Sequence, residues 1–163
     1  MIKITLPDGA VREYEQGTSA YEVARSISEG LAKKVLAASI NLPTGQAGGQ
    51  VWDAARPIEY DASIKLLTWD DADGKSTFWH SSAHLMAEAV EAVFPGVKFW
   101  VGPAIDKGFY YDMDLGDKKI AEEDLALLEK KMNELAKQNN KYVRKAIPKD
   151  EAIKYFSEKW FTI

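Results

Sequence analysis

The sequence predicts an α+β protein built from two modules, and three observations lead to this prediction. The first sixty residues alternate short apolar strands with one capped helix, a polar stretch follows at 69–75, and two long helical patterns dominate the rest. Hydrophobic residues make up 46% of the 163 residues, which is enough for a folded core, and the formal net charge is −4. Cysteine is absent, which excludes disulfides, thiolate nucleophiles and cysteine-ligated metals from these residues.

The N-terminal module is expected to be a hairpin followed by a helix and further strands. Apolar and polar residues alternate on both sides of the turn Pro7-Asp8-Gly9, which indicates the hairpin. Ser19 and Glu22 have the spacing of a capping box, and Gly30 is expected to end the helix. The expected strands are residues 2–6, 11–14, 36–40 and 63–68. This order of elements is that of a β-grasp (ubiquitin-like) fold.

The second module is expected to begin after the polar stretch 69–75. Ser76 or Thr77 is the expected cap of a helix that runs to about Val93 and ends at Pro95-Gly96. Strands are expected at 97–101 and 108–112, a long helix from about 122, and a short helix at 150–157. The long helix is indicated by apolar residues spaced three and four apart, which are Leu125, Leu128, Met132 and Leu135.

The two histidines of the chain, His80 and His84, are four residues apart on the first of these helices. At about 100° per residue they share a face with Ala87 and Glu91, opposite an apolar face formed by Met86, Ala89 and Val93. The pair is therefore expected to point toward a cleft or solvent. This geometry leaves a functional pair and a structural pair equally open. Two ligands do not make a metal site, so none is predicted here.

Two further features have a functional and an ordinary interpretation. The run Gly108-Phe-Tyr-Tyr-Asp112 is either aromatic packing or a platform that presents a phenol to a substrate. Residues 130–163 carry 9 basic and 4 acidic side chains, whereas residues 62–129 carry 6 and 13. This basic stretch is either a solvated helix end or a surface for a polyanion.

The residues resemble a known family. Residues 1–68, with a Leu-Pro-Asp-Gly turn and a Ser-Ala-Tyr-Glu-Val-Ala helix, resemble a TGS domain, a β-grasp module of threonyl-tRNA synthetases, certain GTPases and stringent-response enzymes. Further motifs in order and spacing resemble the N-terminal region of bacterial threonyl-tRNA synthetases. They are His80-Ser-Ser-Ala-His84, Phe94-Pro-Gly-Val-Lys98, Val101-Gly-Pro-Ala-Ile105 and Gly108-Phe-Tyr-Tyr-Asp112.

The resemblance implies a TGS domain at 1–68 and the first part of an α+β tRNA-editing domain at 76–163. The whole enzyme attaches threonine to tRNA(Thr) with ATP and hydrolyses mischarged seryl-tRNA(Thr). His80 and His84 match the histidine pair of the editing cleft, and Tyr111 matches a tyrosine that lines it. The tRNA-facing patch is expected to comprise Lys137, Lys141, Arg144 and Lys145.

In this family, residues further along the chain complete the editing cleft. The resemblance thus implies an N-terminal fragment that is inactive alone and holds no cofactor. ATP, magnesium and zinc belong to the downstream core, through which the whole enzyme forms a homodimer in the cytoplasm, without a membrane partner. Two alternatives stay open. One is a non-catalytic TGS-type module that binds RNA or protein and has structural histidines, and the other is a metallohydrolase that uses the His-x-x-x-His pair.

Overall fold

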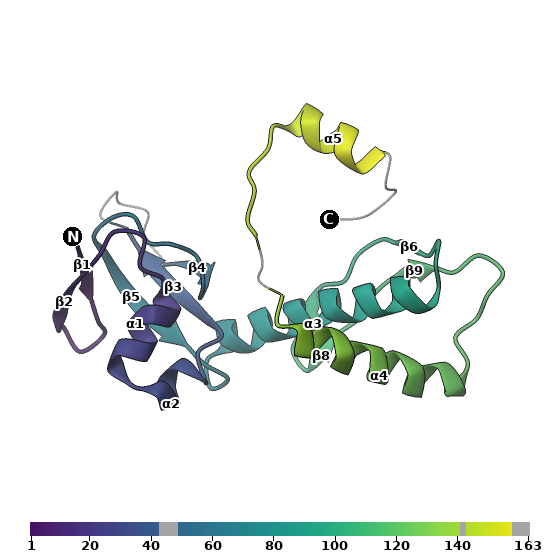
Figure 1. Ribbon diagram of the computed structural model, residues 1–163, viewed down its shortest axis with the longest axis horizontal. Coiled ribbons are helices and arrows are strands. Elements are labelled where there is room, and N and C mark those ends of the chain that lie inside the picture. The colour runs from purple at the N-terminus through teal and green to yellow at the C-terminus, as the bar shows by residue number, and fades with distance from the viewer. Residues whose placement is uncertain (43–48, 141–142, 158–163) are drawn as a thin grey trace. The chain divides into compact units, whose positions relative to one another are not determined.

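The computed structural model describes residues 1–42, 49–140 and 143–157, apart from the side chains of residues 156 and 157. The chain divides into two compact units, unit 1 (Met1–Phe78) and unit 2 (Trp79–Ile163), shown in Figure 1. Unit 1 contains a mixed sheet with two short helices, and unit 2 contains helices with pairs of very short strands. This mixture of elements confirms the α+β class.

The sheet of unit 1 has five strands in the order β2-β1-β5-β3-β4. Its strands are β1 (Ile2–Thr5), β2 (Val11–Tyr14), β3 (Ala37–Asn41), β4 (Gln50–Asp53) and β5 (Ala62–Leu67). β1 and β2 form the expected antiparallel hairpin, whereas β1 and β5, which are far apart in sequence, pair in parallel at the centre. β3 pairs antiparallel with both β5 and β4. The expected strand positions are confirmed to within two residues.

The first helix, α1 (Ala20–Ile27), begins with the predicted capping box. The Ser19 side chain accepts a hydrogen bond from the Glu22 amide at 3.3 Å, and the Glu22 carboxylate accepts one from the Ser19 amide at 2.8 Å. The expected end at Gly30 is wrong. Ser28 ends α1 and also caps the next helix, α2 (Glu29–Ala32), so Gly30 lies inside a helical turn. The Ser28 hydroxyl accepts the Leu31 amide at 3.1 Å, and this contact caps the start of α2.

The core of unit 1 lies between α1 and one face of the sheet (Figure 1). Ile2, Ile4 and Leu6 are buried while their sequence neighbours are not, as the alternation predicts. Val23 of α1 and Ile58 of the loop before β5 are fully buried in the same cluster. Both α1 and the loop before β5 therefore contribute buried side chains to this core.

The long helix α3 (Ala72–Val93) begins earlier than the sequence analysis expected. The expected caps, Ser76 and Thr77, lie inside the helix, and the Thr77 hydroxyl donates to the backbone carbonyl of Asp73. Residues 72–75 of the polar stretch are helical and do not form an irregular linker. The boundary between the two compact units falls between Phe78 and Trp79. The division into domains at 1–68 and 76–163 stays a prediction.

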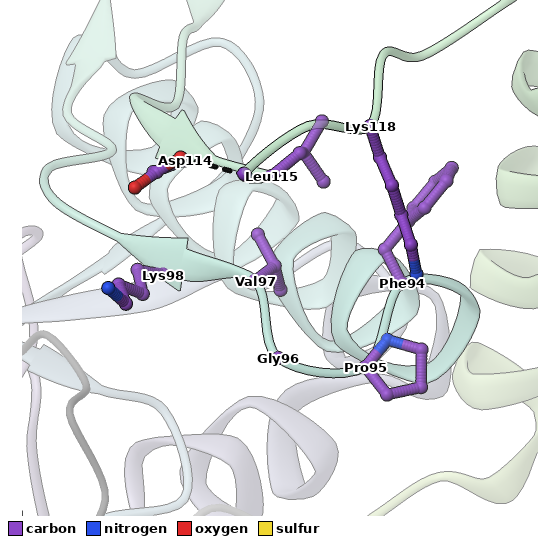
Figure 2. A pocket seen from close by; sticks show the side chains of 9 residues that line it. Phe94, Pro95, Gly96, Val97, Lys98, Asp114, Leu115 and Lys118 are labelled. Atoms are coloured by element: carbon purple, nitrogen blue, oxygen red, sulfur yellow. Dashed lines mark hydrogen bonds between the residues drawn. The ribbon is translucent and has the colours of Figure 1, made fainter.

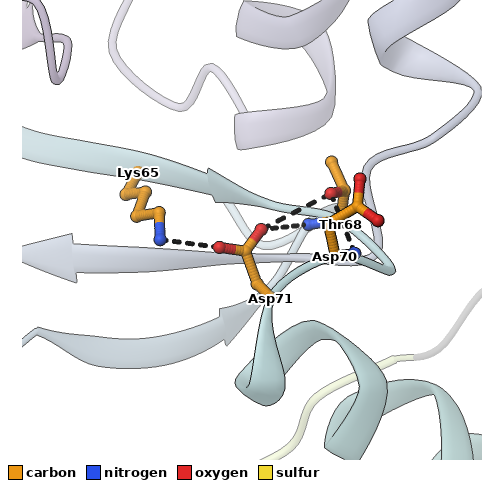
Figure 3. A network of polar contacts seen from close by, with 4 residues as sticks. All are labelled: Lys65, Thr68, Asp70 and Asp71. Atoms are coloured by element: carbon orange, nitrogen blue, oxygen red, sulfur yellow. Dashed lines mark hydrogen bonds and ion pairs between the residues drawn. The ribbon is translucent and has the colours of Figure 1, made fainter.

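Thr68, Asp70 and Asp71 form a hydrogen-bonded turn between the end of β5 and the start of α3 (Figure 3). The Asp71 carboxylate accepts the Thr68 amide at 2.9 Å and the Lys65 ammonium at 2.6 Å, and the Thr68 hydroxyl accepts the Asp70 amide at 3.4 Å. A Cβ on Gly74 would lie 2.0 Å from the Thr68 carbonyl oxygen. Only glycine lets the first helical turn come this close to the end of β5.

In its described residues, unit 2 contains the rest of α3, two further helices and two short strand pairs. Its further elements are β6 (Lys98–Phe99), β7 (Ala104–Ile105), β8 (Gly108–Phe109), β9 (Met113–Asp114), α4 (Glu122–Gln138) and α5 (Lys149–Ser157). β6 pairs with β9 and β7 pairs with β8, so the strands expected at 97–101 and 108–112 form one interrupted hairpin, residues 98–114. The two pairs are offset by one residue, which breaks the ladder between them.

The core of unit 2 is small and lies where α4 runs beside the second half of α3 (Figure 1). Its buried members are Ala89, Val90, Phe94, Val97 and Leu128. Met132 and Leu135 pack against this cluster, whereas Leu125 is 58% exposed. Leu125 lies in the first turn of α4, outside this cluster. No helix in the described part of the chain is both long and apolar enough to cross a bilayer.

Candidate functional site

The two histidines of α3 lie close enough to share a proton. Their Nε2 atoms are 3.1 Å apart, and the rings meet edge to face with centroids separated by 4.7 Å. One nitrogen of this contact must carry a hydrogen and the other must offer its lone pair. The pair can therefore hold and pass one proton, and a second proton would break the contact and place two positive charges together.

The two imidazoles have different surroundings. His80 is exposed, whereas His84 is half-buried. Burial lowers the pKa of His84 below its ordinary value of 6.5, and the neighbouring His80 lowers it further. His84 is consequently neutral at pH 7, where its lone pair can accept a hydrogen bond from His80 or from a substrate group.

The histidines lie at the edge of the buried side of α3. Ala87, which was expected to share their open face, is only 9% exposed, so that part of the prediction is wrong. Ala83, Ala87 and Val90 continue the buried stripe up to the position of His80 on the helical wheel. His84 is half-buried at this edge, while Glu91 on the same face is exposed. The pair is thus neither in the core nor fully in solvent.

Tyr111 lies in the interrupted hairpin and its ring is half-buried. The ring packs edge-on against Phe99, with centroids 5.2 Å apart, and lies directly over Gly102. Phe109 and Tyr111 are partly buried whereas Tyr110 and Asp112 are exposed, as the alternation of side chains along an extended strand requires. Burial raises the pKa of Tyr111 above its ordinary value of 10.0, so its phenol is a neutral hydrogen-bond donor at pH 7.

An aromatic contact joins the two elements that carry the candidate residues. Trp79, which immediately precedes His80, lies with its ring centroid 6.4 Å from that of Phe109, two residues before Tyr111. The hairpin therefore packs near the helical turn that carries the histidines. Among the described residues, neither histidine is hydrogen-bonded to Tyr111. The fold thus brings together the two elements that carry the candidate residues.

The basic residues that were expected to face tRNA are only partly described. Lys137 lies in the last turn of α4, and Arg144 and Lys145 follow in a stretch without regular structure. All three side chains are exposed. Lys141 lies outside the described residues. A common tRNA-facing patch stays a prediction.

A small cavity lies beyond the end of α3, away from the histidines in sequence (Figure 2). Its volume is about 130 Å³, and its lining includes Phe94, Lys98, Asp114 and Lys118. Asp114 already accepts the Gly116 amide at 2.8 Å. Within the described residues, no three histidine or acidic side chains gather in a way that could hold a metal ion.

Comparison with known proteins first gives the class of unit 1. Residues 2–68 match the family described as "TGS domain", which agrees with the observed β-grasp order of strands and helix. The chain carries a TGS domain at its N-terminal end.

The rest of the chain is covered by similarity to longer proteins. The chain is 57% identical over 159 residues to a threonine–tRNA ligase of Cytophaga hutchinsonii. The matched segment covers 98% of this chain and 24% of that protein. Threonine–tRNA ligases of Parabacteroides distasonis and Porphyromonas gingivalis are 53% and 52% identical, each with 98% of this chain and 23% of the relative covered. Almost the whole chain thus resembles the N-terminal region of bacterial threonine–tRNA ligases, and it spans about a quarter of their length.

Proposed function

We propose that this chain acts as the N-terminal region of a threonine–tRNA ligase, and that unit 2 supplies the histidine pair of a site that hydrolyses seryl-tRNA(Thr). The observation that carries this proposal is the 3.1 Å contact between His80 and His84 on a half-exposed edge of α3. It occurs in a chain whose relatives are ligases specific to threonine by name.

A separate hydrolytic site meets a physical need of such an enzyme. Serine differs from threonine by one missing methyl group, and a pocket that fits threonine also admits serine. A difference of this size supports only about 1–3 kcal/mol of discrimination in binding. A second site that accepts the smaller amino acid and hydrolyses its ester removes the error.

The histidine pair and the tyrosine suit ester hydrolysis. A water molecule attacks the carbonyl carbon of the seryl ester, the bond from that carbon to the ribose oxygen breaks, and the ribose oxygen leaves with a proton. The pair accepts a proton from the water and returns one to the ribose oxygen, so no net proton is consumed. The neutral phenol of Tyr111 donates a hydrogen bond that orients the substrate.

The other parts of the proposal rest on the similarity to the ligases. The whole protein joins threonine to tRNA(Thr) with ATP, and its ATP, magnesium and zinc lie in a core outside these 163 residues. We assign to that core the contacts of a homodimer, and we place the enzyme in the cytoplasm. Lys137, Lys141, Arg144 and Lys145 contact the phosphates of the tRNA, and the 163 residues alone are inactive.

Hydrolysis of seryl-tRNA(Thr) tests this proposal. The chain is assayed alone and in a hybrid in which it replaces the matching quarter of the Cytophaga hutchinsonii ligase. The hybrid is expected to hydrolyse the ester, and the chain alone is not. His80→Ala or His84→Ala in the hybrid is expected to slow hydrolysis about 10²–10⁴-fold, the usual effect of losing an acid–base group.

Glu88→Ala is the matched control, because Glu88 is exposed on the same helix and has no assigned role. Threonine attachment by each hybrid reports that the rest of the enzyme is intact. Hydrolysis at the full rate by the His80→Ala hybrid would show that the pair takes no part in the reaction. Hydrolysis by the chain alone would refute its inactivity.

The half-burial of His84 favours one alternative, a non-catalytic module that binds RNA or protein and uses the pair for stability. In that case His84→Ala lowers the melting temperature by several degrees while tRNA binding and hydrolysis in the hybrid stay unchanged. For the metallohydrolase alternative, elemental analysis must find zinc in a one-to-one ratio with the chain.

A further inference from the structure

The ring of Tyr111 rests on the backbone of the opposite side of its hairpin. A Cβ built on Gly102 would lie 2.4 Å from both Cδ2 and Cε2 of Tyr111, and 2.9 Å from its Cζ. Real Cβ atoms do not approach other atoms this closely, so any other residue at position 102 must displace the ring. We propose that Gly102 is a positioning residue for Tyr111, whose ring it seats together with Phe99. This inference rests on the role proposed for Tyr111.

Backbone conformation does not explain the glycine at this position. The described glycines with positive φ are Gly9, Gly17, Gly96, Gly108 and Gly116. Gly102 is described and is absent from this set, so an L-residue could adopt its φ without strain. The space taken by the Tyr111 ring is therefore the local feature that requires a residue without a side chain.

The surrounding backbone prevents the hairpin from simply widening around a larger residue. The Trp100 amide donates to the Asp112 carbonyl at 2.9 Å, and the Asp112 amide donates to the Val101 carbonyl at 2.8 Å. These two bonds hold the strands together next to Gly102 and Tyr111. Phe99 packs edge-on against the ring at 5.2 Å and limits its sideways movement. The ring is thus held from below by Gly102 and from one side by Phe99.

The position of the ring matters because the same hairpin packs near the histidines. Phe109, two residues before Tyr111, contacts Trp79, which precedes His80. A ring seated firmly on the hairpin presents its phenol at a constant place relative to that helical turn. Gly102 acts only through Tyr111 and makes no contact with a substrate.

A titration of the 163-residue chain tests the seating without any assay of function. The chain is labelled with ¹³Cζ-tyrosine, and the Tyr111 signal is assigned by its loss in Tyr111→Phe. In Gly102→Ala the displaced ring becomes more exposed, so its pKa falls toward the ordinary value of tyrosine, about 10. Gly30→Ala is the control, because the nearest atom to its added Cβ is 3.9 Å away in unit 1.

If Gly102→Ala does not fold, Phe99→Leu keeps the glycine, removes the edge-on ring and is expected to lower the Tyr111 pKa by a smaller amount. An unchanged Tyr111 pKa in Gly102→Ala, or in Phe99→Leu where that variant must be used, overturns the inference. This outcome does not depend on the function of the protein.

The hybrid ligase tests the consequence for hydrolysis. Gly102→Ala is expected to lower kcat for seryl-tRNA(Thr) by about the same factor as Tyr111→Phe, and the double variant by no more than either alone. Normal hydrolysis by Gly102→Ala beside slow hydrolysis by Tyr111→Phe overturns the inference and leaves the proposed function standing. Multiplied effects in the double variant overturn it as well. A parent hybrid without hydrolysis refutes the proposed function, and the titration then decides the seating by itself.

Discussion

The two units of this chain differ in how much of their structure comes from regular strand pairing. Unit 1 has a five-stranded sheet with strands of four to six residues and a helix packed on one face. Each strand pair described in unit 2 is two residues long, and its core is a small cluster where α3 meets α4. The candidate site residues all lie in the less regular unit.

This difference separates the residues that stabilise the chain from those proposed to act. Long ladders and a covered sheet face give unit 1 many mutually dependent contacts, whereas the hairpin of unit 2 depends on side chains such as Phe99 and Tyr111. Local opening should therefore be easiest in unit 2. Four predictions test this comparison, from the largest expected effect to the smallest.

The core of the sheet should give the largest loss. Ile4→Ala removes a fully buried side chain from the central strand pair and is expected to cost about 2–5 kcal/mol of unfolding free energy. Urea unfolding followed by amide exchange in the strands of unit 1 measures this cost. Leu128→Ala makes a matched change in the core of unit 2. Equal loss of protection in the sheet from both variants would contradict the separation of the units.

The junction between β5 and α3 should tolerate no added methyl group. Gly74→Ala places a Cβ 2.0 Å from the Thr68 carbonyl, so the first turn of the helix must shift, at a cost of about 1–3 kcal/mol. Thermal unfolding compares it with Gly30→Ala in a short helix of the same unit, where the nearest atom to the added Cβ is 3.9 Å away. Similar melting temperatures for the two variants would mean that the close approach does not stabilise unit 1.

The carboxylate of Asp71 should contribute stability that depends on pH. The Lys65 ammonium and the Thr68 amide hold its pKa below the ordinary value of 3.8. Its contribution is therefore full above about pH 4 and is lost as the pH falls through the folded-state pKa. At pH 7 Asp71→Ala is expected to lower the unfolding free energy by about 1 kcal/mol, the usual loss when a hydrogen-bond partner is removed. Urea unfolding from pH 7 to pH 2 measures the difference, which must shrink at the acid end; a constant difference would contradict the assignment.

Titration of His84 should give the smallest change in stability, and this change should occur at a higher pH than that of Asp71. Because the folded state lowers its pKa below 6.5, the unfolded chain binds more protons as the pH falls through 6.5, and stability decreases. The loss is expected to be smaller than that caused by Asp71→Ala. Histidine ¹H–¹⁵N spectra recorded from pH 8 to pH 5 follow both rings, with His80→Gln as the comparison. A His84 pKa above 6.5 would rule out the neutral acceptor proposed for the site.

Much of the fold could be predicted because its signals are local. The alternation at residues 2–6, the capping box at Ser19 and the helical period from Glu122 each act over a few residues. The start of α3 at Ala72 was missed, because the turn that precedes it lies in the polar stretch that the sequence analysis interprets as a boundary between modules. That interpretation places Asp70, Asp71 and Asp73 in a polar linker and not close to the start of a helix.

The candidate site was predictable in its residues and not in its contacts. The four-residue spacing of His80 and His84 places the rings together on any helix, and the structure agrees. The burial of Ala87 was predicted wrongly because the width of the buried stripe depends on which elements pack against α3. The seat of Tyr111 on Gly102 joins residues nine positions apart across a broken ladder, and no local pattern specifies it.

The sequence by itself determined the class of fold, the hairpin, the first helix and the strands β3 and β5 of unit 1, and the spacing that places His80 beside His84, because hydrophobic period, capping and turn chemistry act along the chain. Tertiary structure alone decided the parallel pairing of β1 with β5, the extent of the buried face of α3 and the place of the Tyr111 ring. Each of these depends on contacts between segments distant in sequence or separated by an irregular turn. Their energies arise from burial and close packing, which only the folded chain establishes.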